Sequence, residues 1–193
     1  MKIILGSASP RRKKIMQEMG YEFDVIVPDV DEKSIRREKP EELVIALAHA
    51  KADNVIAKLS EPAVVIAVDL VVAHKGIIRE KAVSLEEARI FLQSYSESHT
   101  EVYAGIVVVN SETGAREAAC EKAVVHFKAL PEEAIEEILR NPNVLDWAGA
   151  FGIQDPYVAQ FVERIEGNPD TVIGMPKRLT HQLIEKASVV HIL

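Results

Sequence analysis

Apolar and polar positions along the chain divide it into segments of strand character and segments of helix character. Ile3–Leu5 is a short apolar run, which is typical of a buried strand. Ser9 and Pro10 have the form of an N-cap followed by a first-turn proline, so they predict a helix that ends near Gly20. The run Ala63–Ala73 is almost wholly apolar and predicts a central strand that is covered on both faces.

The remaining segments show the same two kinds of pattern. Ser84 begins a capping box, and Ser111–Gly114 reads as a hairpin turn with glycine at the special position. Phe161–Gly167 alternates like a strand, although a helix is possible there. The predicted strands are Phe23–Val27, Glu101–Asn110, Arg116–Lys128, Phe161–Gly167 and Val189–Leu193, and the predicted helices are Pro40–Val55, Ser84–Ser94, Pro131–Arg140 and Lys177–Lys186.

One charged residue, Asp69, stands in the middle of the long apolar run Ala63–Ala73. An unpaired carboxylate in a covered strand would destabilise the fold by on the order of several kcal/mol, because its charge would lose hydration without gaining a partner. Asp69 is therefore expected at the mouth of the strand, in an ion pair, or on a metal. Buried acids of this kind are candidates for a functional site.

Small and basic residues follow the first strand. Ser7 and Ser9 supply hydroxyls, and Arg11 and Arg12 fall in the first turn of the predicted helix. Together with the free N–H groups of a helix start, they form a suitable site for an anion such as phosphate. A basic, solvated helix start is the alternative.

The polar segment 28–40 brings several acids close together, among them Asp31 and Glu32. Carboxylates beside a phosphate site could hold Mg²⁺, which takes one or two protein carboxylates and keeps water and phosphate oxygens as its other ligands. The alternative is a solvated acidic loop.

The length of the chain bears on its domain organisation, and its net charge bears on the kind of ligand that it binds. The 193 residues suit one domain or two closely joined lobes, and the net charge of −7 makes broad binding to a nucleic acid polymer unlikely on electrostatic grounds. A basic cluster in an acidic protein favours a small anionic ligand. The single cysteine, Cys120, excludes an internal disulfide and fits a reducing cytoplasm. No run of apolar residues approaches the ~20 residues of a membrane span. The sequence also lacks the histidine spacing of a zinc site, the P-loop motif and the G-x-S-x-G motif of esterases.

The stretch Ser7–Arg12 (SASPRR) resembles the N-terminal S-x-S-P-R-R signature of the Maf family of nucleoside triphosphate pyrophosphatases. Leu70, Ala82 and Ala104 stand where the family has threonine, proline and threonine. The other matching segments follow in the family's order: AHAKAD around Lys51, AVDLVV around Asp69, REKAVS around Lys81, HTEVYAG at 99–105, DWAGAFGIQ at 146–154 and NPDTVIGMP at 168–176.

This resemblance implies a fold and a reaction. The fold would be α/β, an elongated two-lobed molecule with a long mixed sheet flanked by helices and a central groove, formed by residues 1–193 as a single domain. The protein would be a cytoplasmic homodimer. It would hydrolyse a nucleoside triphosphate to a monophosphate and pyrophosphate, with dTTP and UTP preferred. The same reaction on methylated GTP, or a weakly active nucleotide-binding regulator of cell division, are the alternatives.

The resemblance also assigns roles to residues. Asp69 would be the general base, and Lys81 and Glu32 would assist catalysis. Glu32 and Asp69 would hold Mg²⁺ or Mn²⁺. Asp146 could ligate metal or cap a turn. Phosphate binding is assigned to Ser7, Ser9, Arg11, Arg12 and Lys51, and base selection to Arg11, Leu70 and Gln154.

Overall fold

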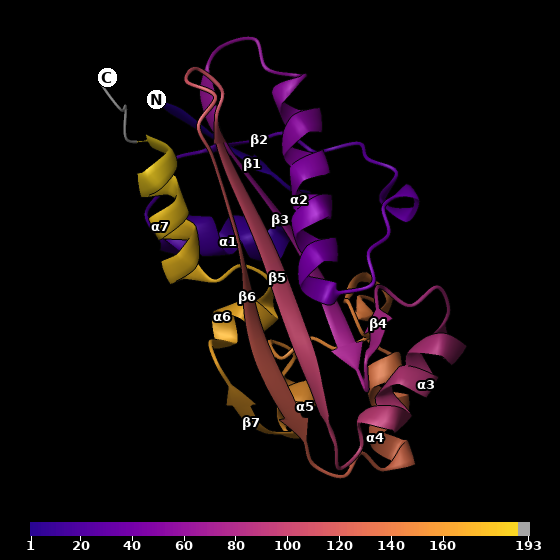
Figure 1. Cartoon of the computed structure of the whole chain (residues 1–193). Helices are drawn as coiled ribbons and strands as arrows, with labels where there is room; N and C mark the ends of the chain where they lie inside the picture. Colours follow the sequence, from indigo (N-terminus) through magenta and orange to yellow (C-terminus); the bar gives the residue numbers. More distant parts are fainter. Residues whose placement is uncertain (189–193) are drawn as a thin grey trace. The chain divides into compact units, whose positions relative to one another are not determined.

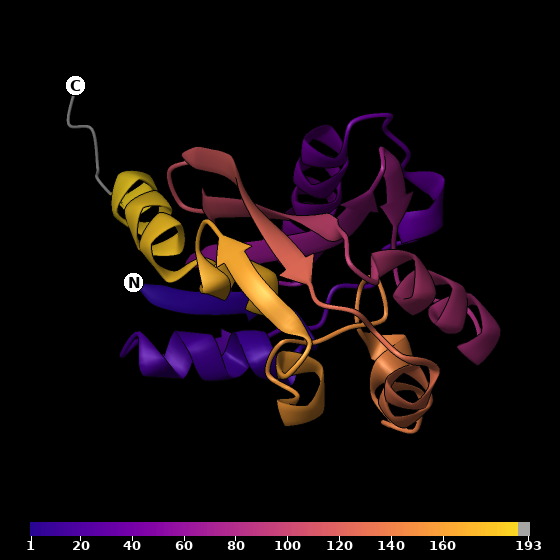
Figure 2. The same ribbon diagram turned by 90° about the horizontal axis from the view of Figure 1, so that it is seen from below.

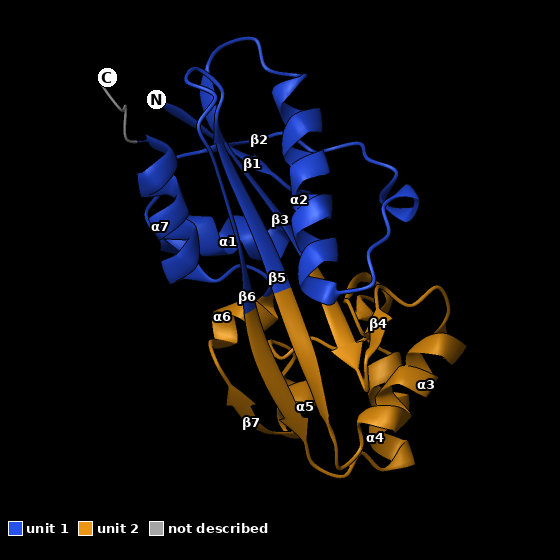
Figure 3. Ribbon diagram, viewed as in Figure 1, with its two compact units in different colours: residues 1–69, 104–121, 174–193 blue, residues 70–103, 122–173 orange. Residues whose placement is uncertain are grey.

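The computed structural model describes residues 1–188, so the predicted strand Val189–Leu193 lies outside the described residues. The chain divides into two compact units (Figure 3). Strands β3 (Ala63–His74), β5 (His99–Asn110) and β6 (Arg116–Phe127) contribute residues to both units. Unit 1 consists of Met1–Asp69, Ala104–Glu121 and, of the described residues, 174–188, and unit 2 consists of Leu70–Tyr103 and Lys122–Ile173.

Unit 1 is built on parallel strand pairs. Strand β1 (Lys2–Gly6) pairs in parallel with β2 (Asp24–Val25) on one side and with β3 on the other. Helices α1 (Pro10–Glu18) and α2 (Pro40–Ile56) lie on opposite faces of these strands (Figure 2). The remaining elements of unit 1 are the short 3₁₀ helix η1 (Glu32–Ser34) and helix α7 (Lys177–Ser188).

The core of unit 1 is aliphatic, and α2 approaches the sheet closely. A Cβ atom added at Gly105 of β5 would lie 2.6 Å from the backbone carbon of Val44 on α2. Only glycine fits at such a distance, so this residue fixes how near the helix packs. The buried cluster beneath α2 comprises Ile4, Ala48, Ala52, Val55, Ala63, Val65, Ala67, Val107 and Val109.

Unit 2 adds antiparallel strands and an aromatic core. Tyr95, Phe127 and Phe151 are buried and contact one another with ring centroids 5.2–5.7 Å apart. Strand β4 (Ile77–Arg79) pairs with β3, and β7 (Val162–Glu166) pairs with β6. Figure 1 labels four helices of unit 2, which are α3 (Leu85–Tyr95), α4 (Glu132–Leu139), α5 (Pro156–Ala159) and α6 (Pro169–Ile173). The short 3₁₀ helix η2 (Val144–Asp146) belongs to the same unit.

The α/β class and the mixed sheet flanked by helices are confirmed. Phe161–Gly167 forms strand β7 rather than a helix, whereas the predicted strand Phe23–Val27 shortens to the two residues of β2. The short elements β4, α5 and α6 were not predicted, because three to five residues carry too little periodicity. Within residues 1–188 no helix combines the length and apolar character needed to cross a bilayer. The elongated shape, the groove and the single-domain organisation stay predictions.

Candidate active site

The side-chain hydroxyls of Ser7 and Ser9 accept hydrogen bonds that hold the loop between β1 and α1 in place. Ser9 is the N-cap of α1, and its hydroxyl accepts a hydrogen bond from the Arg12 backbone N–H at 3.5 Å. The hydroxyl of the buried Ser7 accepts bonds from the Ser9 N–H at 3.2 Å and from the Arg12 guanidinium at 3.4 Å. Two of the predicted phosphate-binding serines are thus held in place at a helix N-terminus, where backbone N–H groups lack helical partners.

The side chain of Arg12 contacts backbone oxygens of two segments that are distant in the sequence. The Arg12 guanidinium donates to the backbone oxygen of Val68 at 2.7 Å and to that of Gly174 at 3.2 Å. Burial lowers the pKa of Arg12, while the nearby Asp69 carboxylate acts in the opposite direction. Arg12 is therefore not the solvated side chain of the alternative interpretation. Arg11 is half-buried on the same turn.

Because Val68 directly precedes Asp69, the bond from Arg12 also fixes the backbone of β3 at the point where this carboxylate is attached. The guanidinium group thereby joins the loop after β1, strand β3 and the segment before α7 within unit 1. A fork with five N–H donors can make these contacts and still offer donors to a ligand.

Asp69 is in an ion pair, which is one of the three arrangements expected for it. The Lys51 ammonium on α2 forms an ion pair with Asp69 Oδ1, and it lies 3.0 Å from Oε1 of Glu32 on η1. Lys51 is only 7% exposed and Asp69 only 5%, whereas the Glu32 side chain is 52% exposed. Lys51 is therefore a buried lysine, and the cluster of Glu32, Lys51 and Asp69 runs from the interior of unit 1 to its surface.

Burial raises the pKa of Asp69, and the Lys51 and Arg12 charges oppose this rise. A carboxyl group whose pKa is raised is a better proton acceptor near neutral pH than an ordinary aspartate. Strongly desolvated carboxylates with a defined charged partner are common at catalytic sites, and such a group suits a general base.

The same carboxylates could serve a metal ion. Within residues 1–188, no group of three or more His, Cys, Asp or Glu side chains is arranged to hold one. Glu32 and Asp69 nevertheless place one carboxylate oxygen each on the Lys51 ammonium. A hard divalent cation needs only one or two protein carboxylates when water and phosphate supply its other ligands, so this pair fits Mg²⁺ or Mn²⁺.

The remaining predicted residues belong to unit 2. Lys81 is exposed, and its backbone forms an antiparallel bridge with Ala148. The Gly149 N–H donates to the Glu80 oxygen at 2.9 Å, which fixes the DWAGAFGIQ segment beside Lys81. Gln154, at the end of that segment, is exposed, as is Asp146 within η2.

Leu70 opens unit 2 directly after the Asp69 carboxylate. Its side chain is half-buried and packs against the hydrophobic core of unit 2. Leu70 thus has a structural role, and its assignment to base selection stays a prediction.

Comparison with known proteins identifies the family. Residues 2–187 match the family model described as "Maf-like protein". The chain belongs to the Maf family. A 7-methyl-GTP pyrophosphatase from Dictyostelium discoideum is 35% identical over 193 residues, covering 96% of this chain and 97% of the relative. A dTTP/UTP pyrophosphatase from Thermotoga maritima is 42% identical over 185 residues, covering 95% and 88%, and one from Vibrio vulnificus is 35% identical over 185 residues, covering 96% and 98%. The resemblance drawn from the motifs is confirmed.

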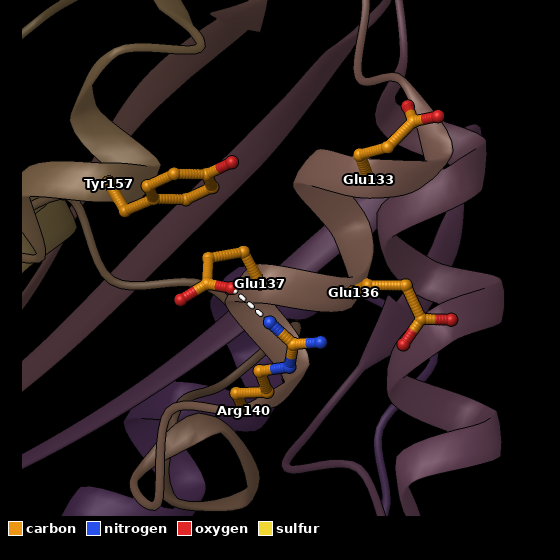
Figure 4. Close-up of a pocket in the computed structure, with 5 residues that line it drawn as sticks. All are labelled: Glu133, Glu136, Glu137, Arg140 and Tyr157. Atoms are coloured by element: carbon orange, nitrogen blue, oxygen red, sulfur yellow. Dashed lines mark hydrogen bonds and ion pairs between the residues drawn. The ribbon is translucent and has the colours of Figure 1, made fainter.

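This Maf family member also has a pocket of about 520 Å³ in unit 2, and none of the predicted site residues lines it. Figure 4 shows the side chains that line it, and the Arg140 guanidinium donates to the Glu137 carboxylate at 2.6 Å. Carboxylates dominate the lining, so they would repel a triphosphate. The lining residues are Glu133, Glu136, Glu137, Arg140 and Tyr157.

Sequence reasoning missed the backbone oxygens that hold Arg12 in this Maf site. The acceptors, Val68 and Gly174, are 56 and 162 residues from Arg12 in the chain. Residue types give no signal for a carbonyl acceptor, because every residue has one. The single hint was that Gly174 lies in the matched segment NPDTVIGMP.

Proposed function

We propose that this Maf family member hydrolyses dTTP or UTP to the nucleoside monophosphate and pyrophosphate. The observation that carries the proposal is the buried pairing of Lys51 with Asp69, next to the guanidinium of Arg12. A site with a desolvated carboxylate and buried positive charges suits attack of water on a polyanionic substrate. The relatives named dTTP/UTP pyrophosphatase support the choice of base.

Asp69 is the proposed general base. It takes a proton from the water that attacks the α-phosphorus, while the bond from the α-phosphorus to the leaving pyrophosphate oxygen breaks. The raised pKa of Asp69 supports this role, since a base with a pKa nearer the working pH holds the proton more effectively in the transition state. Arg12, through its bond to the Val68 oxygen, holds the backbone that carries this carboxylate.

Positive and hydroxyl groups of unit 1 are proposed to bind the phosphates. Ser7, Ser9 and Arg11 lie at the N-terminus of α1, where unpaired backbone N–H groups add to anion binding. Arg12 and Lys51 contribute positive charge. Lys81, from unit 2, is proposed to assist by neutralising charge that develops on the leaving group.

Glu32 and Asp69 are proposed to hold Mg²⁺ or Mn²⁺. When bound, the ion would neutralise phosphate charge and act as a Lewis acid on phosphoryl oxygens. The carboxylate pair on the Lys51 ammonium supports this choice of ligands. Exhaustive treatment with EDTA should abolish pyrophosphate release, and added Mg²⁺ should restore it. Full activity in the treated protein would exclude the metal.

Base selection is proposed to involve Arg11, Leu70 and Gln154. The exposed amide of Gln154 offers a paired donor and acceptor that match the edge of a pyrimidine. A 7-methyl-GTP pyrophosphatase of similar coverage makes methylated GTP the second candidate substrate.

The deciding experiment measures pyrophosphate release by the purified protein with Mg²⁺ and a panel of dTTP, UTP, CTP, GTP and 7-methyl-GTP. We expect the highest kcat/KM for dTTP or UTP. A clear preference for 7-methyl-GTP would select the second candidate. Binding without turnover of any member would instead support a nucleotide-binding regulator. Assembly as a homodimer stays a prediction, and light scattering after size-exclusion chromatography measures it.

A further inference from the structure

The Lys51 ammonium occupies the point where two carboxylates meet. It lies 3.0 Å from Oε1 of Glu32 and also pairs with Oδ1 of Asp69. The side chains of Lys51 and Asp69 are 9% and 8% exposed, so solvent screens their attraction only weakly. This lysine thus contacts one oxygen of each carboxylate that we propose as a metal ligand.

A divalent cation that bridges Glu32 and Asp69 through these two oxygens would lie where the ammonium lies. Each carboxylate has a second oxygen, but the two positive charges would repel each other strongly at so short a distance. A lysine ammonium has three donors and no lone pair, so it cannot itself become a metal ligand while protonated. Its presence between the carboxylates therefore opposes metal binding.

We infer that Lys51 serves as a resident cation for Glu32 and Asp69, which a divalent ion must displace before it binds. The inference rests on the proposed function for the identity of the metal-binding carboxylates. It assigns Lys51 a role distinct from phosphate binding: it neutralises the pair in the absence of substrate and lowers the affinity of the free protein for metal.

The position of Lys51 on α2 allows this displacement. The backbone of α2 is anchored by buried residues on either side of Lys51, including Ala48, Ala52 and Val55. The ammonium is joined to that backbone by a flexible four-carbon stem, so rotation about side-chain bonds moves the charge without moving the helix. Once displaced, the ammonium is available to a phosphate, which accommodates the role that the sequence predicts for Lys51.

Three possible roles of Lys51 make different predictions for the variant Lys51→Met, which removes the charge and keeps an unbranched apolar stem. If Lys51 competes with metal, its loss leaves the carboxylates without a resident cation and metal binds more tightly. If Lys51 instead organises the carboxylates, its loss weakens metal binding. If Lys51 only binds phosphate, metal binding to nucleotide-free protein does not change.

The test is titration of nucleotide-free protein with Mn²⁺, followed by electron paramagnetic resonance of the free ion. We expect Lys51→Met to bind Mn²⁺ at least about tenfold more tightly than the wild type, a change of about 1.4 kcal/mol. The matched control is Lys186→Met, which removes an exposed positive charge on α7 of the same unit. The control should differ from the wild type by less than about twofold, since exposed charges are screened. Unchanged or weaker binding by Lys51→Met overturns the inference.

A measurement on the wild type covers the case in which Lys51→Met does not fold. The ¹⁵N signal of a buried, ion-paired ammonium is distinct from those of solvated lysines, and Lys51→Arg identifies it by its disappearance. Saturating Mg²⁺ without nucleotide should shift this signal, and an unshifted signal overturns the inference. Pyrophosphate release by the wild type is measured separately, so failure of the proposed function and failure of the Lys51 inference give different results.

Discussion

Units 1 and 2 bury different kinds of side chain. Unit 1 buries charge, in the ion pair of Lys51 with Asp69 and in the contacts of Arg12 with backbone oxygens. Unit 2 buries aromatic rings, with Tyr95 stacked on Phe127. Aromatic burial stabilises a fold directly, whereas desolvated charges gain little net stability even when paired.

The difference indicates where each unit's residues act. A chain that keeps charges inside unit 1 gains function there rather than stability, whereas the core of unit 2 acts mainly on stability. Substitutions at the buried charges of unit 1 should therefore act mainly on activity, and substitutions in the aromatic core of unit 2 should act mainly on the melting temperature.

The largest expected effect tests the charge in unit 1. Asp69→Asn keeps the shape of the side chain and removes the carboxylate that serves as base. We expect kcat to fall by about 10²–10⁴-fold with the fold retained, the usual worth of a positioned general base. Steady-state pyrophosphate release and circular dichroism measure the two quantities. A variant with most of the wild-type activity would remove Asp69 from this role.

The next effect concerns Arg12. Arg12→Ala removes the donor to the Val68 and Gly174 oxygens as well as a charge for phosphate. We expect kcat/KM to fall by an amount that corresponds to roughly 1.5–3 kcal/mol of lost transition-state stabilisation, which is the contribution of a charged hydrogen bond. The control is Arg89→Ala in unit 2, which breaks exposed ion pairs with Glu132 and Glu136 and should leave kcat/KM unchanged. Equal activity of both variants would remove Arg12 from phosphate binding and leave it a structural role.

A smaller effect is expected at Leu70, the first residue of unit 2. Leu70→Thr withdraws apolar contact from the unit 2 core, so the melting temperature should fall. The added hydroxyl should also sharpen the preference for dTTP or UTP by roughly 2- to 13-fold, as expected for one hydrogen bond worth about 0.5–1.5 kcal/mol. Ratios of kcat/KM across the nucleotide panel decide the point. Unchanged ratios with a lower melting temperature would leave Leu70 a purely structural residue.

The smallest effect is a pH dependence from unit 2. His74 is 2% exposed, its Nδ1 lies 2.9 Å from the His99 oxygen, and burial lowers its pKa. Below the ordinary histidine pKa of about 6.5, His74 binds a proton in the unfolded chain but not in the folded chain. The free energy of unfolding therefore decreases as the pH falls below about 6.5, by at most about 1.4 kcal/mol per pH unit. The free energy of unfolding, measured with urea between pH 7 and pH 5, should change less steeply with pH in His74→Asn than in the wild type. An identical slope would contradict the assignment.

Sequence patterns determined the local structure around the site. The Ser9 cap and Pro10 predicted the start of α1, and the apolar run predicted β3 to within one residue of its end. The single charge in that run predicted that Asp69 lies at the mouth of the strand, in an ion pair or on a metal, and the structure shows the ion pair. These features depend on neighbours in the chain, and caps and periodicity report such neighbours directly.

Tertiary structure alone decided which groups meet. The helical context of Lys51 does not show that its ammonium reaches Asp69, 18 residues away, and Glu32 on η1. Arg12 is held by carbonyl oxygens, which residue identity does not encode. Long-range ion pairs and backbone acceptors depend on how strands and helices pack, so the sequence determined which chemistry is available in this protein and the packing decided which charges are paired.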